Sequence, residues 1–220
     1  MPLSMYQHLV QAMSLSGFEN WRPAVDVPEL DRPVIRPSEL PGPGRIAAVM
    51  IMVYPGSTAN GSVNSGLADS NLVLTKRNSN LSKHASQISF PGGQQDNNEA
   101  LQQTALRETA EEIGIAPSEI DVLGQLNSVY IPPSDFTVTP FVGWHVNQPR
   151  FVRCETEVEE IIETSIAHLL KPSTLTFGLI TRGDGADLNV PFYNVGPHRV
   201  WGATAIMLGE FIERLSNVTN

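Results

Sequence analysis

Basic residues are scarce in this sequence, and the shortage excludes one large class of function. The chain of 220 residues has 14 Lys plus Arg against 23 Asp plus Glu, which gives a formal net charge of −9 at pH 7. A protein that binds duplex nucleic acid needs a basic surface to neutralise the phosphates. We therefore expect no nucleic-acid partner. The same acidic balance would repel a phosphate substrate unless bound metal ions reverse the local charge.

Cysteine and long apolar runs are also scarce. The single cysteine, Cys154, cannot form a disulfide within the chain, which is typical of a reducing compartment. No stretch approaches the ~20 apolar residues of a membrane span, so we expect no membrane partner. The first 21 residues lack the pattern of a secretory signal, and the last residues, LSNVTN, carry no Ser-Lys-Leu-type address. We therefore expect a cytoplasmic protein.

Composition divides the chain into an N-terminal arm and one main domain. Residues 4–15 can form a short amphipathic helix, and the proline-rich stretch 22–44 indicates an extended arm over the domain surface. We assign residues 1–44 to this helix and arm, and residues 45–220 to a domain large enough for one sizeable core. The N-terminal arm is also a candidate to cross the boundary of a homodimer.

Strand patterns dominate the centre of the main domain. Apolar runs over 45–54 and 71–77 flank a linker of small polar residues at 56–70, which favours a hairpin. Further strands are predicted over 120–129, 137–146, the start of 158–172, 189–195 and 198–202. Helices are predicted after an N-cap at Asp96, Asn97 or Asn98, before Pro172 and over 204–217. The pattern predicts an α/β sandwich around a mixed sheet.

The most informative stretch is residues 92–115. It places Arg107, Glu108, Glu111 and Glu112 within six consecutive positions. On a helix, residues three and four apart share a face, so the three glutamates would converge at a cost in repulsion. Carboxylate oxygens suit hard divalent cations such as Mg²⁺ or Mn²⁺. We therefore predict a metal site here; the alternative is a solvated acidic surface helix.

The residues around the acids support a helix that packs on a sheet. Leu106, Thr109, Ala110 and Ile113 recur at helical spacing and form a stripe that can face the core. Gly114 suits the left-handed position that ends a helix. Arg107 can reach Glu111 on the next turn or fold back to Glu99 in the preceding loop.

These offsets resemble the Nudix box, G-x5-E-x7-R-E-U-x-E-E-x-G-U, where U is a bulky apolar residue. Thr109, at the first U position, departs from the pattern. The matching residues are Gly93, Glu99, Arg107, Glu108, Glu111, Glu112, Gly114 and Ile115. The resemblance implies a Nudix-type α/β/α sandwich around a mixed β-sheet. It also implies hydrolysis of a diphosphate joined to another moiety, with Mg²⁺ or Mn²⁺ as cofactor.

The stretch before the box resembles that of the coenzyme A pyrophosphatase subfamily, with an L-L-T-x-R pattern, a basic residue, a histidine and F-P-G-G. The matching residues are Leu74, Thr75, Arg77, His84, Phe90, Pro91, Gly92 and Gly93. Ser82 stands where the subfamily has arginine, and Ser86 where it has glycine. The first departure matters because arginine is the natural bidentate partner of a phosphate such as the 3′-phosphate of coenzyme A.

The resemblance, which extends over about residues 45–216, assigns roles to individual residues. The implied metal ligands are Glu108, Glu112, Glu111 and the backbone carbonyl of Gly93. The implied catalytic residues are Glu111, Glu108, Arg107 and Glu157, with Glu159 and Glu160 as alternatives to Glu157. The implied substrate-binding residues are Arg77, Lys76, His84 and Lys83. The identity of the general base stays open, and a structural hydrogen bond is an equal reading for His84.

The resemblance implies a small-molecule nucleoside diphosphate substrate. Coenzyme A or an acyl derivative would give 3′,5′-ADP and (acyl-)4′-phosphopantetheine. The alternatives are another Nudix hydrolase, acting on an ADP-sugar or NADH, and a Nudix protein that binds a ligand without catalysis. A silent sensor would be expected to lose box carboxylates, and this sequence retains all three.

Overall fold

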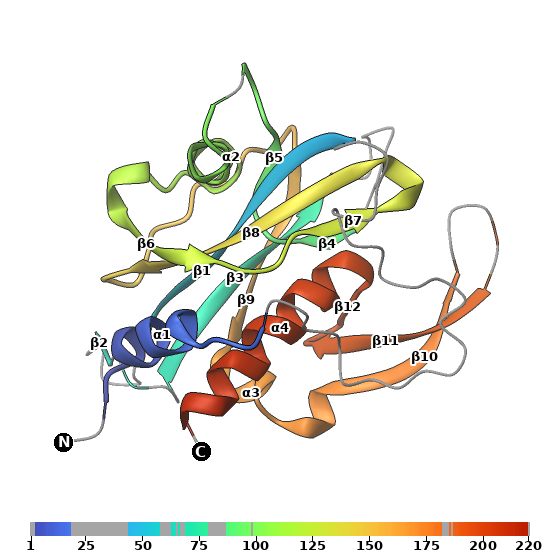
Figure 1. The fold of residues 1–220 in the computed structure, drawn as a ribbon. Coiled ribbons are helices and arrows are strands. Elements are labelled where there is room, and N and C mark those ends of the chain that lie inside the picture. The colour runs from blue at the N-terminus through green and yellow to red at the C-terminus, as the bar shows by residue number, and fades with distance from the viewer. Residues whose placement is uncertain are drawn as a thin grey trace.

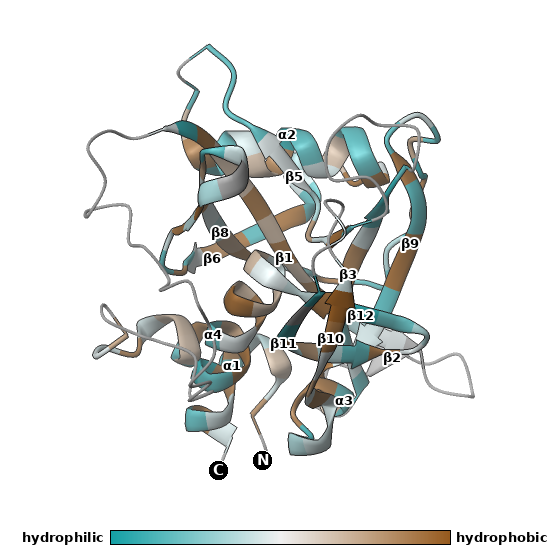
Figure 2. Cartoon of the chain, turned by 90° about the vertical axis from the view of Figure 1, so that its right-hand side faces the viewer, coloured by the Kyte–Doolittle hydropathy of each residue, from teal (hydrophilic) through white to brown (hydrophobic). Residues whose placement is uncertain are grey.

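A long parallel pair of strands, β1 (Arg45–Ser57) and β8 (Phe136–His145), forms the centre of the main sheet (Figure 1). The two strands pair over residues 45–53 of β1. β1 is almost continuously apolar, as expected of a strand covered on both faces, and residues 50–54 are fully buried. Figure 2 shows this hydrophobic strand in brown at the centre of the sheet. The two runs predicted as strands here are confirmed.

The structure is a computed structural model that describes residues 3–18, 44–57, 63–64, 66, 69–78, 87–97, 99–181, 185 and 187–219. Almost all of the predicted arm and most of the predicted linker at 56–70 lie outside these residues. His84 and Lys83 also lie outside them. The division of the chain at residue 44 therefore stays a prediction.

The other strands of the main sheet pair antiparallel, so the sheet is mixed as predicted. β2, β3 and β5 all pair with β1, β9 and β4 extend the sheet beyond β3, and β6 and β7 pair with β8. These strands are β2 (Val63–Asn64), β3 (Ser70–Arg77), β4 (Ile88–Ser89), β5 (Gly92–Gln94), β6 (Ile120–Gln125), β7 (Val129–Ile131) and β9 (Val158–Ser165).

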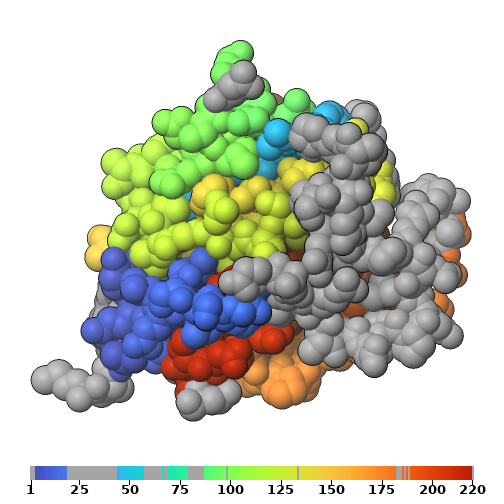
Figure 3. Space-filling model, in the orientation of Figure 1, coloured from blue at the N-terminus to red at the C-terminus, as the bar shows by residue number. Residues whose placement is uncertain are grey.

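Helices cover both faces of this sheet and give the predicted three-layer α/β/α arrangement. α2 (Leu101–Ile113) lies on one face, and α1 (Met5–Ser14) and α4 (Gly202–Thr219) lie on the other (Figure 1). Each face has its own cluster of buried apolar side chains. Figure 3 shows α1, in blue, against α4, in red. No described helix has both the length and the apolar character needed to cross a membrane.

A second sheet lies beside α4. It consists of β10 (Leu175–Thr181), β11 (Asp187–Val195) and β12 (His198–Trp201), all antiparallel. The hairpin between β11 and β12 was predicted and is confirmed. β10 was not predicted; Gly178 interrupts its apolar run, LTFGLIT, and weakens the strand pattern. That glycine lies close to Phe192, where an added Cβ would be 3.0 Å from the ring.

Prolines begin the short helical connections. The turns at Pro117–Glu119, Pro132–Ser134 and Pro172–Thr174 are 3₁₀ helices with proline in their first positions. Proline fits there because the first residues of a helix need no N–H donor. The last of these turns follows α3 (Ile166–Leu169), which therefore ends before Pro172 as predicted.

Candidate active site

α2 ends where the sequence predicts. Gly114 has φ 76° and ψ 20°, the left-handed conformation, and its N–H donates to the carbonyl of Ala110 at 3.0 Å. Thr109 and Ile113 are buried against the sheet. The hydroxyl of Thr109 donates to the carbonyl of Ala105 at 2.6 Å, so this departure from the box pattern leaves no buried donor unpaired.

The three glutamates of α2 do not share one environment. The side chain of Glu111 is 53% exposed, that of Glu108 is 14% exposed and that of Glu112 is only 2% exposed. The buried face of the helix is therefore rotated relative to the predicted stripe, and it includes Glu112. This position matters because a buried carboxylate is stable as an anion only with compensating partners.

Glu112 has few such partners. The N–H of Gly92 donates to its Oε2 at 3.4 Å, and Nη1 of Arg77 lies 3.8 Å from its Oε1. Burial raises the pKa of Glu112 to about 8; the Arg77 charge opposes this shift, and the nearby Glu108 adds to it. At neutral pH the protein without a bound cation therefore holds Glu112 largely protonated.

Glu108 lies directly against the backbone of Gly93. A Cβ added at Gly93 would be 2.4–2.5 Å from the Glu108 carboxylate, so a side chain at this position would displace it. β5 brings Gly93 here by pairing it with Ala48 of β1. Burial raises the pKa of Glu108, although its hydrogen bond to Arg107 acts in the opposite direction.

Arg107 connects the acids to the loop before the helix. Its guanidinium donates to Glu99 at 2.8 and 3.2 Å, to Glu108 at 2.8 Å, to Glu111 at 3.2 Å and to the carbonyl of Gln94 at 3.1 Å. Both predicted contacts of Arg107 are confirmed. The bond from Arg107 lowers the pKa of Glu99 to about 2, and the same bond raises the pKa of Arg107.

Of the three candidate acids outside the box, Glu157 is the one whose backbone lies next to the cluster: its carbonyl accepts from the N–H of Asn78, the residue after Arg77, at 2.8 Å. Its charge contributes to the raised pKa values of Glu108 and Glu112, after the larger effect of burial. Glu159 instead pairs with Lys76 at 2.6 Å, and Glu160 lies 3.1 Å from His198.

The predicted substrate-binding residues on β3 point in opposite directions. Successive side chains of a strand alternate between faces, so Arg77 lies on the α2 side near Glu112, while Lys76 lies on the other side with Glu159. The structure therefore does not bring Lys76 to the acids. The Nε of Arg77 is buried and has no hydrogen-bond partner in the described part of the chain.

Two backbone groups of this site were not assigned by the sequence. The N–H of Gly92 reaches Glu112, and the carbonyl of Gln94 accepts from Arg107. Both belong to β5, which the sequence presented only as a turn. The Gly-Gly pair was the available signal, because glycine in a strand marks a close approach of the backbone to another group.

Comparison with known proteins decides the family. The NUDIX domain profile matches residues 59–173, just over half of the chain. NudL of Citrobacter koseri, an uncharacterized Nudix hydrolase, is 33% identical over 202 residues, which cover 89% of this chain and 90% of NudL. The chain belongs to the Nudix family. Its box is the segment from Gly93 to Ile115, and the predicted fold class is confirmed.

Other Nudix relatives carry names for their activity. The mitochondrial coenzyme A diphosphatase NUDT8 of Homo sapiens is 37% identical over 139 residues, which cover 62% of this chain and 59% of NUDT8. The alignment thus spans less than two thirds of that protein. Among solved structures, the MutT protein of Methanosarcina mazei has a TM-score of 0.48 and 18% identity, with coverage of 81% of this chain and 96% of that one.

The Nudix acids fit a divalent cation that takes only part of its ligands from protein. No three His, Cys, Asp or Glu side chains among the described residues form a ready-made metal cage. Mg²⁺ often binds through one or two carboxylates, with water and substrate phosphates completing the shell. Glu108 and Glu112 are two such carboxylates, and both have raised pKa values, which a neighbouring cation would lower.

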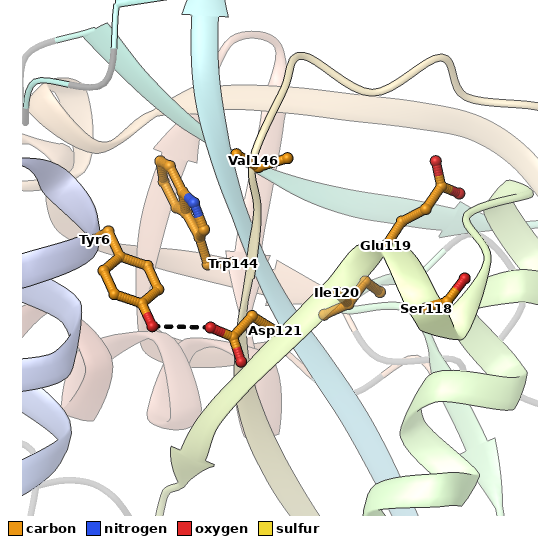
Figure 4. Close-up of a pocket in the computed structure, with 7 residues that line it drawn as sticks. All are labelled: Tyr6, Ser118, Glu119, Ile120, Asp121, Trp144 and Val146. Carbon is orange, nitrogen blue, oxygen red and sulfur yellow. Dashed lines mark hydrogen bonds between the residues drawn. The ribbon is translucent and has the colours of Figure 1, made fainter.

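A separate hollow lies at the β6 edge of the Nudix sheet, between α1 and β6 (Figure 4). Its volume is about 590 Å³. The lining residues are Tyr6, Ser118, Glu119, Ile120, Asp121, Trp144 and Val146. The hydroxyl of Tyr6 donates to Asp121 at 2.8 Å, and the Tyr6 ring meets Trp144 edge to face. The hollow shares no residue with the acid cluster.

Proposed function

We propose that this Nudix protein hydrolyses a diphosphate linkage in a nucleoside derivative, with Mg²⁺ or Mn²⁺ as its cofactor. The observation that carries the proposal is the pair of carboxylates formed by the buried Glu112 and the partly buried Glu108, held against the backbone of Gly92 and Gly93. Two acids in this position are costly to the metal-free protein, and a cation of charge +2 would offset the cost. A structural helix would gain nothing from the arrangement.

The residues of the site have distinct tasks in this reaction. A bound divalent cation would neutralise charge on the phosphoryl oxygens and lower the pKa of water. Glu108 and Glu112 would hold it, with Glu111 and the carbonyl of Gly93 as further ligands. Arg107 fixes the Glu108 carboxylate through their 2.8 Å hydrogen bond. Glu111 and Glu157 are the two candidates to accept the proton of the attacking water.

Coenzyme A or an acyl-coenzyme A is the substrate that we propose. Hydrolysis would break one P–O bond of the diphosphate and give 3′,5′-ADP and (acyl-)4′-phosphopantetheine. The coenzyme A diphosphatase NUDT8 of Homo sapiens and that of Mus musculus are each 37% identical to this chain, which supports this substrate. Of the predicted substrate-binding residues that the structure describes, Arg77 is the one beside the acids, and its guanidinium supports a role in binding a phosphate oxygen.

A different nucleoside diphosphate derivative, such as an ADP-sugar or NADH, is the second candidate. Ser82 favours it, because the subfamily has at this position an arginine suited to the 3′-phosphate of coenzyme A. Lys83 and His84 are the remaining predicted substrate-binding residues in that segment. A cytoplasmic location and a homodimer stay predictions; human NUDT8 is named as a mitochondrial protein.

A substrate panel tests both candidates. Purified protein would be incubated with coenzyme A, dephospho-coenzyme A or ADP-ribose, in Mg²⁺ or Mn²⁺, and the products identified by mass spectrometry. We expect coenzyme A to have the highest kcat/KM. Equal turnover of coenzyme A and dephospho-coenzyme A would reject the proposed substrate. Absence of turnover with every substrate and both metals would reject the proposed hydrolysis.

A further inference from the structure

Glu157 is presented to the acid cluster by a tight turn, Cys154–Val158. The N–H groups of Glu157 and Val158 both donate to the carbonyl of Cys154, at 3.1 and 2.9 Å. The turn follows a long connection from β8 and leads into β9. Connections of this kind are the more mobile parts of a fold unless neighbouring elements fix them. The contacts of this turn with its neighbours therefore decide where the Glu157 carboxylate lies.

The first neighbour is α2, which carries the other acids. The N–H of Cys154 donates to the carbonyl of Glu112 at 3.0 Å, and the N–H of Val152 donates to the carbonyl of Ile113 at 2.9 Å. These bonds satisfy carbonyls at the C-terminal end of the helix, which have no partner within it. They also bring the beginning of the turn next to the acid cluster.

The second neighbour is Asn78, the residue after Arg77 at the end of β3. Its backbone N–H donates to the carbonyl of Glu157 at 2.8 Å, and its Nδ2 donates to the carbonyl of Glu155 at 2.9 Å. The two bonds lie on either side of Thr156. A single residue thus holds the turn at two points, and it does so from the strand that carries Arg77.

The third contact is the side chain of Arg153, which spans the turn. Its Nη1 donates to the carbonyls of Val158, at 3.0 Å, and of Glu159. The pairing of β3 with β9 shifts here, since Lys76 lies opposite Glu160 but Arg77 lies opposite Val158. A shift in register interrupts the regular hydrogen-bond ladder at this point. Arg153 supplies charge-assisted donors at this point.

We infer that Asn78 and Arg153 are positioning residues, which hold the Cys154–Val158 turn so that the Glu157 carboxylate stays beside Glu108 and Glu112. The inference rests on the proposed function, in which Glu157 takes part in hydrolysis. Both side chains bind backbone carbonyls of the turn or of the first residues of β9. They therefore act on the reaction through the position of Glu157.

Single substitutions test the inference with the full chain. Asn78→Ala removes the Nδ2 donor, and Arg153→Met removes the guanidinium while keeping an unbranched apolar chain. We expect each to lower kcat for the substrate identified by the panel by about 10-fold or more, with little change in KM. Arg153→Lys retains a cationic donor and should recover part of the loss. Arg150→Met is the matched control, because Arg150 is exposed in the same connection and should leave kcat unchanged.

A double-mutant cycle separates positioning from a general loss of stability. In a Glu157→Gln background, Asn78→Ala and Arg153→Met should have no further effect on kcat, because the group that they position is already gone. If Asn78→Ala and Arg153→Met lower kcat in the Glu157→Gln background by the same factor as in the wild type, the inference is overturned. Thermal unfolding shows which variants are folded. If Arg153→Met does not fold, Arg153→Lys takes its place in the cycle.

Manganese binding gives a second measurement that needs no turnover. The charge of Glu157 acts on Glu108 and Glu112, so its position also contributes to the affinity of a cation held by those two acids. The dissociation constant of Mn²⁺ alone, measured by electron paramagnetic resonance, should therefore rise in Asn78→Ala and Arg153→Met, but not further in the Glu157→Gln background. If the wild-type protein hydrolyses no substrate, the proposed function fails while this measurement still tests the inference. Wild-type Mn²⁺ affinity together with wild-type kcat in both single variants would overturn it. If no substrate is turned over, so that kcat cannot be measured, wild-type Mn²⁺ affinity in both single variants would by itself overturn the inference.

Discussion

Burial of Glu112 puts a carboxylate where its charged form is costly. The side chain is 2% exposed, and the nearby Arg77 guanidinium is 3.8 Å away, beyond hydrogen-bond distance. A cation bound between Glu112 and Glu108 would remove this cost, so the feature that weakens the metal-free protein would be the one that binds metal. Function and stability therefore make opposite demands on this residue.

Glu112→Gln should separate these two demands. The amide keeps the size of the side chain and an acceptor for the Gly92 N–H, but it cannot become a buried anion. We expect the metal-free variant to gain on the order of 1–3 kcal/mol in free energy of unfolding at pH 8. Hydrolysis should fall by a factor of 100 or more, because a metal ligand is lost. Denaturant unfolding and the substrate panel measure the two effects.

Glu111→Gln is the matched control for stability. Glu111 is 53% exposed, so the same chemical change there should alter the free energy of unfolding by less than about 0.5 kcal/mol. Wild-type hydrolysis in the Glu112 variant would reject the assignment of the site. A loss of stability equal to that of an ordinary core substitution would show that the charge is not costly.

The raised pKa of Glu112 also sets a pH dependence. The folded state holds a proton up to about pH 8, whereas the unfolded chain releases it near the ordinary value of 4.5. The stabilising contribution is therefore complete below about pH 4.5 and is lost as the pH rises toward 8. In metal-free protein, we expect the stability of wild type relative to Glu112→Gln to fall between pH 5 and pH 8.

The contribution of Glu99 to stability depends on pH in the opposite direction and over a lower pH range. Its pKa is lowered to about 2 by Arg107, so its contribution is present above about pH 4.5 and is lost as the pH falls toward 2. The two residues can thus be distinguished by the pH range alone. Adding Mn²⁺ should flatten the dependence between pH 5 and pH 8, and an unchanged slope with saturating Mn²⁺ would contradict the role of Glu112 as a ligand.

At the scale of elements, α2 was largely predictable, but its orientation on the sheet was not. Helical spacing and Gly114 located the helix, because both signals are local. The burial of Glu112 depends on how the helix is rotated against β1 and β5, and no local pattern records that rotation. The opposite directions of Lys76 and Arg77 follow from strand alternation, so this distinction could have been drawn from the sequence.

β5 is the element that makes the site specific, and its two glycines should respond differently to substitution. In Gly93→Ala, the added Cβ would meet the end of the flexible Glu108 side chain, which can move. In Gly92→Ala, it would lie 2.4 Å from the carbonyl oxygen of Ala48 and 2.6 Å from the Cα of Val49, which cannot move without shifting β1. The first change should act on activity and the second on the fold.

We therefore expect Gly93→Ala to lower kcat by about 100-fold while the free energy of unfolding changes by less than about 1 kcal/mol. Gly92→Ala should lose roughly 3 kcal/mol or more, because overpacking here displaces backbone. Urea unfolding and steady-state kinetics of both variants provide the comparison. Equal losses of stability, or a fully active Gly93 variant, would contradict the placement of Glu108 against β5.

At the scale of the whole molecule, the sequence predicted the layers better than the contacts between distant segments. Strands and helices follow from local patterns, and the box identifies the family that arranges them. The buried network around Glu210 follows from neither. Glu210 and Arg214 of α4 pair at 2.9 Å with side chains that are 3% and 9% exposed, and Asn127 donates to Glu210 at 2.9 Å. Arg214 also lies over the ring of Phe18, 4.3 Å from its centre.

This network joins the segment after α1, the β6–β7 connection and α4, on the face of the sheet opposite α2. Arg214→Met would leave the Glu210 carboxylate buried without its cation, and we expect a loss of about 3–5 kcal/mol in free energy of unfolding. Adding Glu210→Gln should recover much of that loss, since a neutral amide can still accept from Asn127.

Activity provides the discriminating measurement for this last prediction. Because the sheet separates the network from Glu108 and Glu112, each folded molecule of the double variant should hydrolyse its substrate at the wild-type rate when assayed well below its Tm. A double variant no more stable than Arg214→Met would show that the lost contact with Phe18, and not the uncompensated charge, determines the loss. A folded double variant with reduced kcat would instead show that the two faces of the sheet are coupled.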